Sequence, residues 1–464
     1  MPPAETQALR TCVERFAAER FLWDRSDGVC INRLAQGTSL GVPPARLAGR
    51  SVLVATSRQL TAALTLIELD GLVRRLMILP PDAAPEHIAI LSQRAGIDAI
   101  VVDDASRSSK VLDFAEHVIC RPAIEPTEAI APAERQTEWV LLTSGTTGVP
   151  KLVVHSLAGL TAAIAADRRL DGAMVWGTFY DIRRYGGLQI FLRAMLGRAS
   201  LVLSEAGEPI ADHLSRLGRH GVTHLSGTPS HWRRALMSPA IRQISPRYVR
   251  LSGEISDQAI LDSLRAAFPN AAVGHAYAST EAGVAFEVVD GLAGFPASYL
   301  DHDRDGVEMK IADGSLRIRS PGAASRYLGS EPTALADSDG FVDSGDMVER
   351  VGDRYVFAGR RGGIINIGGL KVHPEEIEAI INRHPQVRMS LVRPKASPVT
   401  GAVVVADVVL KSGTEPGSGA FAEIESDIMK LCREALPRHK VPAAISFVPA
   451  LDVTAGGKLI RRRG

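Results

Sequence analysis

The chain has 464 residues and an almost even charge balance, with a formal net charge of +1 and 23% charged residues. This length is enough for two or three domains with buried cores. The charge balance and an aromatic content of 5% argue against nucleic-acid binding, which relies on basic patches and stacking rings. No apolar run reaches about 18 residues, so we predict no membrane span.

The four cysteines lie far apart, and their spacing matches no metal-ligand motif: Cys12, Cys30, Cys120 and Cys432. Reduced thiols are therefore expected. The N-terminal segment alternates charged and apolar residues, unlike a secretory signal. These features predict a cytoplasmic protein. The short arginine run at residues 461–463 is interpreted as a solvated tail.

The N-terminal third of the chain is predicted to alternate between strands and helices. A first amphipathic helix is expected over residues 6–21. Apolar patterns then predict strands at residues 51–55, 75–79 and 99–103, and helices at residues 59–71 and 87–95. Strands and helices that alternate at this length predict a mostly parallel sheet covered by helices.

The stretch from Leu141 to Lys151 reads LLTSGTTGVPK and continues an apolar run that starts at Trp139. A strand that feeds such a loop gathers amide N–H groups, four hydroxyls and one ammonium around a small volume, which suits a polyphosphate. The loop is not the common G-x-x-x-x-G-K-[ST] nucleotide loop, because Leu152 follows the lysine and no hydroxyl is placed for magnesium. A flexible surface turn is the alternative interpretation.

The same alternation is predicted beyond this loop. Helices are expected at residues 157–169, 210–220 and 257–267, and strands at residues 199–204, 222–225 and 248–251. The last of these strands runs into Ser252-Gly253-Glu254. Two hairpins are predicted over residues 306–319 and 341–357, with turns at Asp313-Gly314 and Gly352-Asp353.

A domain boundary is predicted in the glycine-rich segment Gly359 to Gly363, which divides the chain into residues 1–360 and 361–464. The smaller unit is expected to contain helices at residues 374–383 and 421–436, and strands at residues 387–392, 402–410 and 444–448. Its first helix begins with a proline, the residue that fits the first helical turn.

Five further motifs follow the loop in order: Tyr277-Ala278-Ser279-Thr280-Glu281, Ser344-Gly345-Asp346, Gly359-Arg360, Gly368 to Glu378 and Thr454 to Lys458. Together with the loop they resemble the adenylate-forming superfamily of acyl-CoA synthetases, peptide-synthetase adenylation domains and luciferases. The resemblance implies an α/β fold with a large N-terminal domain of helix-covered, mostly parallel sheets and a β-rich subdomain. It also implies a small, mobile α+β C-terminal lid.

The resemblance assigns roles to the matching residues. Those expected to hold the β- and γ-phosphates of ATP are Thr143, Ser144, Gly145, Thr146, Thr147, Gly148 and Lys151. Thr280 is expected at the α-phosphate, Glu281 at Mg²⁺, and Asp346 at the ribose hydroxyls. Arg360 is expected near the ribose and phosphates. The residues expected to flank adenine are Ser252, Gly253, Glu254, Ala276 and Tyr277.

Two lid features concern the two half-reactions of this superfamily. Lys458 is expected to bridge the substrate carboxylate and the α-phosphate, as the main catalytic residue of adenylation. Gly368, Gly369 and Lys371 are expected to line the thiol channel after the lid rotates. Gly362 stands where the family hinge usually carries Asp or Lys, and glycine permits the large backbone changes of a pivot.

The segment from Phe179 to Gly187 departs from the family's aromatic-His-x-x-Gly pattern, and Arg184 takes the position of the histidine. Arg183 or Arg184 is expected to balance a second anionic group on the substrate, or else both face solvent. The expected substrate pocket comprises Arg184, Tyr185, Gly187, Thr228, Gly253, His275 and Ala278, with Gly227 and Ser230 as further candidates.

The leading functional hypothesis is an ATP-dependent acid–thiol ligase that forms an acyl-AMP from an aryl or short-to-medium acyl acid and then an acyl-CoA. The implied cofactors are ATP, Mg²⁺ and CoA, or the phosphopantetheine of an acyl carrier protein. A stand-alone adenylating enzyme that passes its adenylate to a carrier protein, an amine or another nucleophile is the first alternative. An inactive nucleotide-binding regulatory protein is the second.

Overall fold

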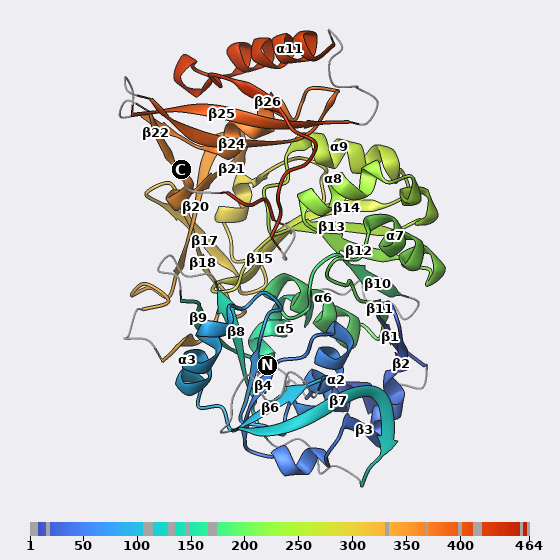
Figure 1. The fold of residues 1–464 in the computed structure, drawn as a ribbon. Helices are drawn as coiled ribbons and strands as arrows, with labels where there is room; N and C mark the ends of the chain where they lie inside the picture. Colours follow the sequence, from blue (N-terminus) through green and yellow to red (C-terminus); the bar gives the residue numbers. More distant parts are fainter. Residues whose placement is uncertain are drawn as a thin grey trace.

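Two large sheets and three smaller ones form the framework of the computed structural model, which describes residues 8–14, 19–104, 115–128, 135–143, 149–165, 174–329, 334–367, 370–397, 401–411, 420–454 and 458–461. Figure 1 shows the N-terminal part of the chain below and the C-terminal part above. No helix in these ranges is long and apolar enough to cross a membrane.

The first sheet has the strand order β15-β14-β13-β12-β10-β11-β1-β2 in the described residues. Its inner strands run parallel, and β2 and β15 pair antiparallel at the two edges. The strands are β1 (Phe21–Trp23), β2 (Gly28–Cys30), β10 (Val175–Thr178), β11 (Ser200–Val202), β12 (His224–Gly227), β13 (Tyr248–Ser252), β14 (Ala272–Ser279) and β15 (Gly283–Val288).

The second sheet has the order β19-β9-β8-β5-β4-β6-β7-β3, again with a parallel centre and antiparallel edges. Its strands are β3 (Gly37–Leu40), β4 (Ser51–Val54), β5 (Arg75–Ile78), β6 (Ala99–Val102), β7 (Glu116–Pro126), β8 (Glu138–Thr143), β9 (Lys151–Ser156) and β19 (Arg326–Leu328). The prediction of mostly parallel sheets is confirmed.

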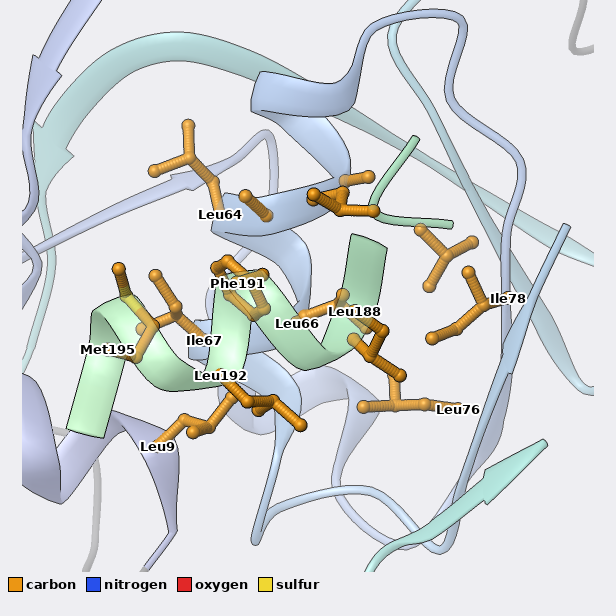
Figure 2. Close-up of a cluster of buried hydrophobic side chains, with 14 of the residues drawn as sticks. Leu9, Leu64, Leu66, Ile67, Leu76, Ile78, Leu188, Phe191, Leu192 and Met195 are labelled. Carbon is orange, nitrogen blue, oxygen red and sulfur yellow. The ribbon is translucent and has the colours of Figure 1, made fainter. Parts of the chain in front are cut away.

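Helices cover both sheets, and three of them lie between the sheets: α2 (Gln59–Leu69), α5 (Leu157–Ala165) and α6 (Tyr185–Leu196). Figure 2 shows Leu188, Phe191 and Leu192 of α6 against Leu64, Leu66 and Ile67 of α2. The helix α1 (Leu9–Glu14) adds Leu9 to this core. Burial of these side chains on both faces of α2 explains why that helix shows little amphipathicity.

The outer faces of the two sheets carry separate cores. Against the first sheet pack α7 (Ile210–Arg219), α8 (Pro229–Met237) and α9 (Gln258–Ala267). Against the second sheet packs α3 (Pro85–Ala95). A third, antiparallel sheet has the order β16-β21-β20-β18-β17, with strands β16 (Phe295–Pro296), β17 (Glu308–Ala312), β18 (Ser315–Arg319), β20 (Val342–Val351) and β21 (Arg354–Arg360).

The C-terminal part of the chain has its own hydrophobic core, which supports a small α+β unit. Its elements are β22 (Ile365–Ile367), β23 (Leu370–Val372), α10 (Pro374–Ile381), β24 (Val387–Ser397), β25 (Gly401–Leu410), α11 (Ala420–Ala435) and β26 (Ile445–Phe447). The position of the domain boundary at residue 360 stays a prediction. In Figure 1 this unit lies above the first sheet and β20–β21.

Most predicted elements occur within a few residues of their expected bounds, and the exceptions have physical reasons. The helix expected over residues 6–21 is described only as α1, and Phe21 begins β1 instead. The strand expected at residues 222–225 starts at His224. The helices α6 and α8 are absent from the sequence predictions, and α6 starts inside a segment interpreted as part of the substrate pocket.

One buried carboxylate joins α1 to the second sheet and generates a test of the fold. Asp70 accepts hydrogen bonds from the Leu9 backbone N–H at 3.0 Å and from Trp139 Nε1 at 2.9 Å. Burial raises the pKa of Asp70 to about 6, although both hydrogen bonds act in the opposite direction. The folded chain therefore binds this proton before the unfolded chain does as the pH falls.

We predict that the unfolding free energy of the wild type rises relative to that of Asp70→Asn as the pH falls from 7.5 to 5. The gain should be about 1 kcal/mol at pH 5 and should level off below the unfolded pKa near 4. Urea unfolding of both proteins at a series of pH values measures it. A difference that does not vary with pH would contradict this assignment of Asp70.

Candidate active site

The candidate residues lie where strands of the first sheet end. Thr228 follows β12, Gly253 follows β13 and Thr280 follows β14. These three strands run parallel, so their carboxyl ends share one edge of the sheet. Ligands in open α/β sheets bind at this edge. The sheet topology therefore brings together motifs that are far apart in the sequence.

Lys458 reaches this edge from the C-terminal tail and lies against Gly253. A Cβ atom on Gly253 would lie 3.4 Å from Lys458 Cε and 3.8 Å from Thr228 Cγ2. Gly253 also has a φ of +86°, a conformation that L side chains rarely adopt. Both the backbone and the approach of the lysine thus favour glycine here.

The tail that carries Lys458 is held from two sides. On one side the Leu459 backbone N–H donates to Glu254 Oε1 at 3.0 Å, and Glu254 also accepts from the backbone N–H and hydroxyl of Ser230. On the other side Arg461 donates to both oxygens of Glu378, at 2.8 and 2.6 Å. Because Glu254 belongs to the first sheet's edge and Glu378 to α10, these bonds connect the tail to both parts of the chain.

The Lys458 ammonium lies among charges of both signs. Its side chain keeps contact with solvent, yet crowding by protein atoms lowers its pKa, and the positive charge of Arg360 adds to this effect. The negative charges of Glu254 and Asp346 oppose the shift. Lys458, Arg360 and Asp346 are therefore near enough to act on one another.

Asp346 is held by two of the predicted site residues. β20 and β21 pair Asp346 with Arg360, whose Nε donates to Asp346 Oδ1 at 2.9 Å, and the Tyr277 hydroxyl donates to Oδ2. The charge of Asp346 raises the pKa of Arg360. Burial, with Asp346 next to it, places the pKa of Tyr277 well above its ordinary value.

The ring of Tyr277 is fixed by stacking. It lies nearly parallel to the rings of Phe357 and Phe286, at centroid distances of 5.0 and 5.7 Å. Aromatic pairs at such distances add to the burial energy of their rings. This packing explains how Tyr277 presents its hydroxyl to Asp346 in one orientation.

The two residues that flank the predicted phosphate loop lie opposite each other, since β8 and β9 pair Thr143 with Lys151. The Lys151 ammonium lies 4.7 Å from the centroid of the Tyr327 ring. Burial raises the pKa of Tyr327, and the charge of Glu281 raises it further, so Glu281 lies within electrostatic reach of Tyr327. The loop residues Ser144, Gly145, Thr146, Thr147 and Gly148 lie outside the described residues.

The two arginines of the unusual segment have different surroundings. Arg183 is buried, pairs with Asp181 at 2.6 Å and donates to the backbone oxygens of Thr56 and Ser57. These contacts explain its burial without a substrate, and its part in substrate binding stays a prediction. Arg184 pairs with Asp82 and keeps about a third of its side chain exposed. Its positive charge contributes to the lowered pKa of Lys458.

Other predicted pocket residues have packing partners. Thr228 caps α8, where its side chain accepts from the His231 backbone N–H. His275 Nε2 lies 3.0 Å from the Leu292 carbonyl oxygen. A Cβ on Gly187 would lie 2.1 Å from the Asp181 carbonyl oxygen, so Gly187 allows a close backbone contact. These contacts explain the residue types without a ligand, and their pocket roles stay predictions.

The remaining predicted residues are placed as follows. Ala276 is buried and pairs with Ser252 across β13 and β14, and Ala278 follows an irregularity in β14. Tyr185 is buried with its ring centroid 5.7 Å from that of His155. Lys371 is exposed on β23, and Gly368 and Gly369 lie outside the described residues.

Two residues at the site escaped the sequence predictions. Arg461 was expected in a solvated tail, but it forms the Glu378 ion pair described above, so that expectation is wrong for Arg461. The acidic residues on the predicted first lid helix are compatible with a basic partner, but they do not identify Arg461 as that partner. Tyr327 carried no signal, because its β19 strand joins β9 only through the tertiary fold.

Two protein-family models match this sequence. The model described as AMP-binding enzyme matches residues 54–328, and the model of its C-terminal domain matches residues 376–458. The 4-coumarate–CoA ligase-like 3 protein of Oryza sativa subsp. japonica is 23% identical over 448 residues, which cover 88% of this chain and 72% of the relative.

A second relative differs greatly in length. The probable non-canonical nonribosomal peptide synthetase CymA of Salinispora arenicola is 27% identical over 419 residues, or 83% of this chain. Those residues span only 5% of that synthetase. The region that matches this chain therefore makes up most of the first relative but only a small part of the second.

Solved structures share the fold. A benzoate CoA ligase from Burkholderia xenovorans LB400 superposes with a TM-score of 0.78 at 20% identity, covering 97% of both chains. The anthranilate CoA ligase AuaEII with anthranoyl-AMP gives a TM-score of 0.77 at 17% identity, covering 97% of this chain and 95% of that one. Since the first family model alone covers more than half of the 464 residues, this chain belongs to the AMP-binding enzyme family.

Proposed function

We propose that this protein activates a carboxylic acid with ATP, forms an acyl-adenylate and releases pyrophosphate, and then transfers the acyl group to the thiol of CoA. The observation that carries the proposal is the approach of Lys458 to Gly253, within electrostatic reach of Asp346 and Arg360. A lysine from the C-terminal tail thus meets the edge of the first sheet where three parallel strands end.

The chemistry of adenylation explains why cations gather here. A carboxylate oxygen attacks the α-phosphorus of ATP, a bond from phosphorus to oxygen forms, and the bond to the β-phosphate oxygen breaks to release pyrophosphate. Both reactants are anions, so preorganised positive charge lowers the barrier most. Lys458, Arg360 and Lys151 supply three cations on separate elements, and Lys458 is the one on the tail.

The other residues fit the remaining parts of the nucleotide. Asp346 uses two of roughly four acceptor positions for Tyr277 and Arg360, which leaves acceptors for ribose hydroxyls. Mg²⁺ favours one or two carboxylates together with phosphate oxygens, and Glu281, whose charge reaches Tyr327, fits this donor set. Bound there, the ion would neutralise phosphate charge.

In the second half-reaction a thiol sulfur attacks the acyl carbonyl carbon, the bond to the phosphate oxygen breaks, AMP leaves, and the thiol proton passes to solvent. This step needs a different arrangement of the C-terminal unit, because Lys458 occupies the edge of the first sheet. A Cβ on Gly362 or Gly363 would meet no atom within 4 Å, so neither glycine is locked by packing. Lys371 is exposed on β23, so its side chain is accessible to an acceptor.

The acceptor is the point on which a second candidate function rests. A relative that covers the same region is a nonribosomal peptide synthetase, and others are named as 4-coumarate–CoA ligases. Transfer to a carrier protein or an amine is therefore the alternative to CoA. The candidate catalytic residues Lys458, Glu281, Asp346 and Arg360 argue against an inactive regulatory protein, because a protein without activity has no need to keep all of them.

Replacing Lys458 tests the adenylation half-reaction. We expect Lys458→Ala to lower acid-dependent exchange between pyrophosphate and ATP by about 100-fold or more, because a charge aimed at the transition state is lost. The affinity for ATP, measured by calorimetry, should change little. Lys395→Ala removes an exposed lysine on β24 and serves as the control. Normal exchange by Lys458→Ala would refute the assigned role.

Restricting Gly362 tests the transfer half-reaction. We expect Gly362→Pro to keep acid-dependent pyrophosphate exchange but to slow CoA-dependent AMP release by about tenfold or more, since proline fixes φ and limits a pivot. Gly362→Ala is the matched control. AMP release that needs a carrier protein or an amine, and ignores CoA, would favour the alternative acceptor. Equal rates of AMP release by both variants would contradict the proposed role of Gly362 as a pivot.

A further inference from the structure

A histidine lies in the apolar layer between the two large sheets. Trp139 and Leu141 of β8 belong to this layer, and β9 pairs His155 with Trp139. Residues that lie directly opposite each other on antiparallel strands point to the same face of the sheet, so the His155 side chain enters the same layer. It is only 2% exposed, and its ring centroid lies 5.7 Å from that of Tyr185 on α6. A polar ring therefore stands where the surrounding layer is mostly apolar.

Neither ring nitrogen of His155 has a hydrogen-bond partner of ordinary geometry among the described residues. Burial lowers the pKa of His155 to about 4, so the ring is neutral at pH 7 and carries one N–H donor and one acceptor nitrogen. An enclosed polar group without a partner costs free energy that an apolar side chain of similar shape would not. Such a group in a folded protein calls for a physical explanation.

The segment that carries Thr280 lies beside His155. The Ala324 backbone N–H donates to the carbonyl oxygen of Glu281 at 2.9 Å. The Ser325 backbone N–H donates at 2.8 Å to the carbonyl oxygen of the residue that precedes His155 on β9. Two consecutive residues thus join the neighbour of Thr280 to the neighbour of His155, and they hold the two segments side by side.

The Thr280 backbone also acts on the ring itself. Burial lowers the pKa of His155, and the Thr280 backbone opposes this shift, as a hydrogen-bond acceptor does. The acceptor of a backbone is its carbonyl oxygen. This oxygen is therefore close to a ring nitrogen, but not in ordinary hydrogen-bond geometry. Hydrogen bonds of catalytic sites are often long before the substrate binds and tighten in its complex.

The residues on either side of Thr280 are held by the chain itself. The Ala282 backbone N–H donates to Ser279 Oγ at 3.0 Å. Gly283 has a φ of +80°, and a Cβ there would lie 2.5 Å from a neighbouring carbonyl oxygen, so the turn packs tightly. Against this fixed frame, His155 is a side chain that can orient Thr280 from the opposite sheet.

We propose that His155 is a positioning residue for adenylation, whose ring N–H donates to the Thr280 carbonyl oxygen in the ATP complex and fixes the Thr280 side chain at the α-phosphate. The inference rests on the proposed function, because it takes Thr280 to contact that phosphate. In this role His155 touches neither the acid nor the nucleotide and acts only through Thr280. Small displacements of a group aimed at the reacting atoms slow a reaction strongly.

His155→Phe keeps a buried aromatic ring and removes both nitrogens. We expect kcat for acid-dependent pyrophosphate exchange to fall by about tenfold and the KM for ATP to change little, because the contact matters most in the transition state. The urea midpoint should stay the same or rise, since an apolar ring replaces a buried polar one. An unchanged kcat would overturn the inference and leave the proposed function standing. A wild type without acid-dependent exchange would instead remove the proposed function.

A matched control separates positioning from stability. Val153 is buried two residues before His155, on the same face of β9, because it pairs with Leu141 of β8. Val153→Ala should lower the urea midpoint through lost packing and keep the exchange kcat close to that of the wild type. If both variants lost kcat in proportion to their loss of stability, the role of His155 would be structural and the inference would be wrong.

A double-mutant cycle tests whether His155 acts through Thr280. In Thr280→Ala, which lacks the hydroxyl, adding His155→Phe should change kcat by less than about twofold, against about tenfold in the wild type. His155→Asn and His155→Gln each keep an amide N–H donor, and at least one of them should recover part of the lost kcat. Independent losses in the cycle, or no recovery with either amide, would contradict the hydrogen bond from His155 to Thr280.

Discussion

The position of the Lys458 ammonium group depends on how the residues that follow it, Leu459 and Arg461, are anchored. The Leu459 N–H is held by Glu254 at the edge of the first sheet, and Arg461 is held by Glu378 on α10. Lys458 directly precedes the first of these anchors, and its side chain lies against Gly253. The proposed chemistry relies on this placement, because a flexible lysine would have to be ordered in the transition state at an entropic cost.

The sheets supply the fixed half of this arrangement. Parallel strands align their carboxyl ends, so Thr228, Gly253 and Thr280 lie at the same edge of the sheet although they are far apart in the sequence. The helices α2, α5 and α6 fill the space between the two large sheets. Figure 2 shows side chains of α2 and α6 in this buried layer. The third sheet adds Asp346 and Arg360 through the pairing of β20 with β21.

Three carboxylates at the candidate site are already engaged by partners within the chain. The anchoring carboxylates Glu254 and Glu378 are engaged by the tail, and Asp346 is engaged by Arg360 and Tyr277. The C-terminal unit is joined to the body by the bond between Leu459 and Glu254 and by a hydrogen bond from Asn382 Nδ2 to Asp257 Oδ2 at 3.2 Å. The rearrangement that the proposed thiol transfer needs would break both, whereas the pair between Arg461 and Glu378 lies within the C-terminal unit and would persist.

The sequence predicted the parts of this picture that depend on local pattern. The alternation of strands and helices predicted the parallel sheets, and the order of the motifs predicted the family. Contacts made only by the tertiary fold were not predictable: the ion pair of Arg461, the position of Tyr327 beside Lys151, and the separate surroundings of Arg183 and Arg184. Neighbouring arginines look alike in a sequence, and only packing distinguishes a buried one from an exposed one.

A crystal structure with a non-hydrolysable acyl-adenylate analogue would test the central claim most directly. The account predicts that Lys458 Nζ and the Thr280 side chain both lie within hydrogen-bond distance of the group that replaces the α-phosphate, with the ribose hydroxyls on Asp346. An analogue bound elsewhere, or one bound at this edge of the sheet with Lys458 remote from it, would contradict the account.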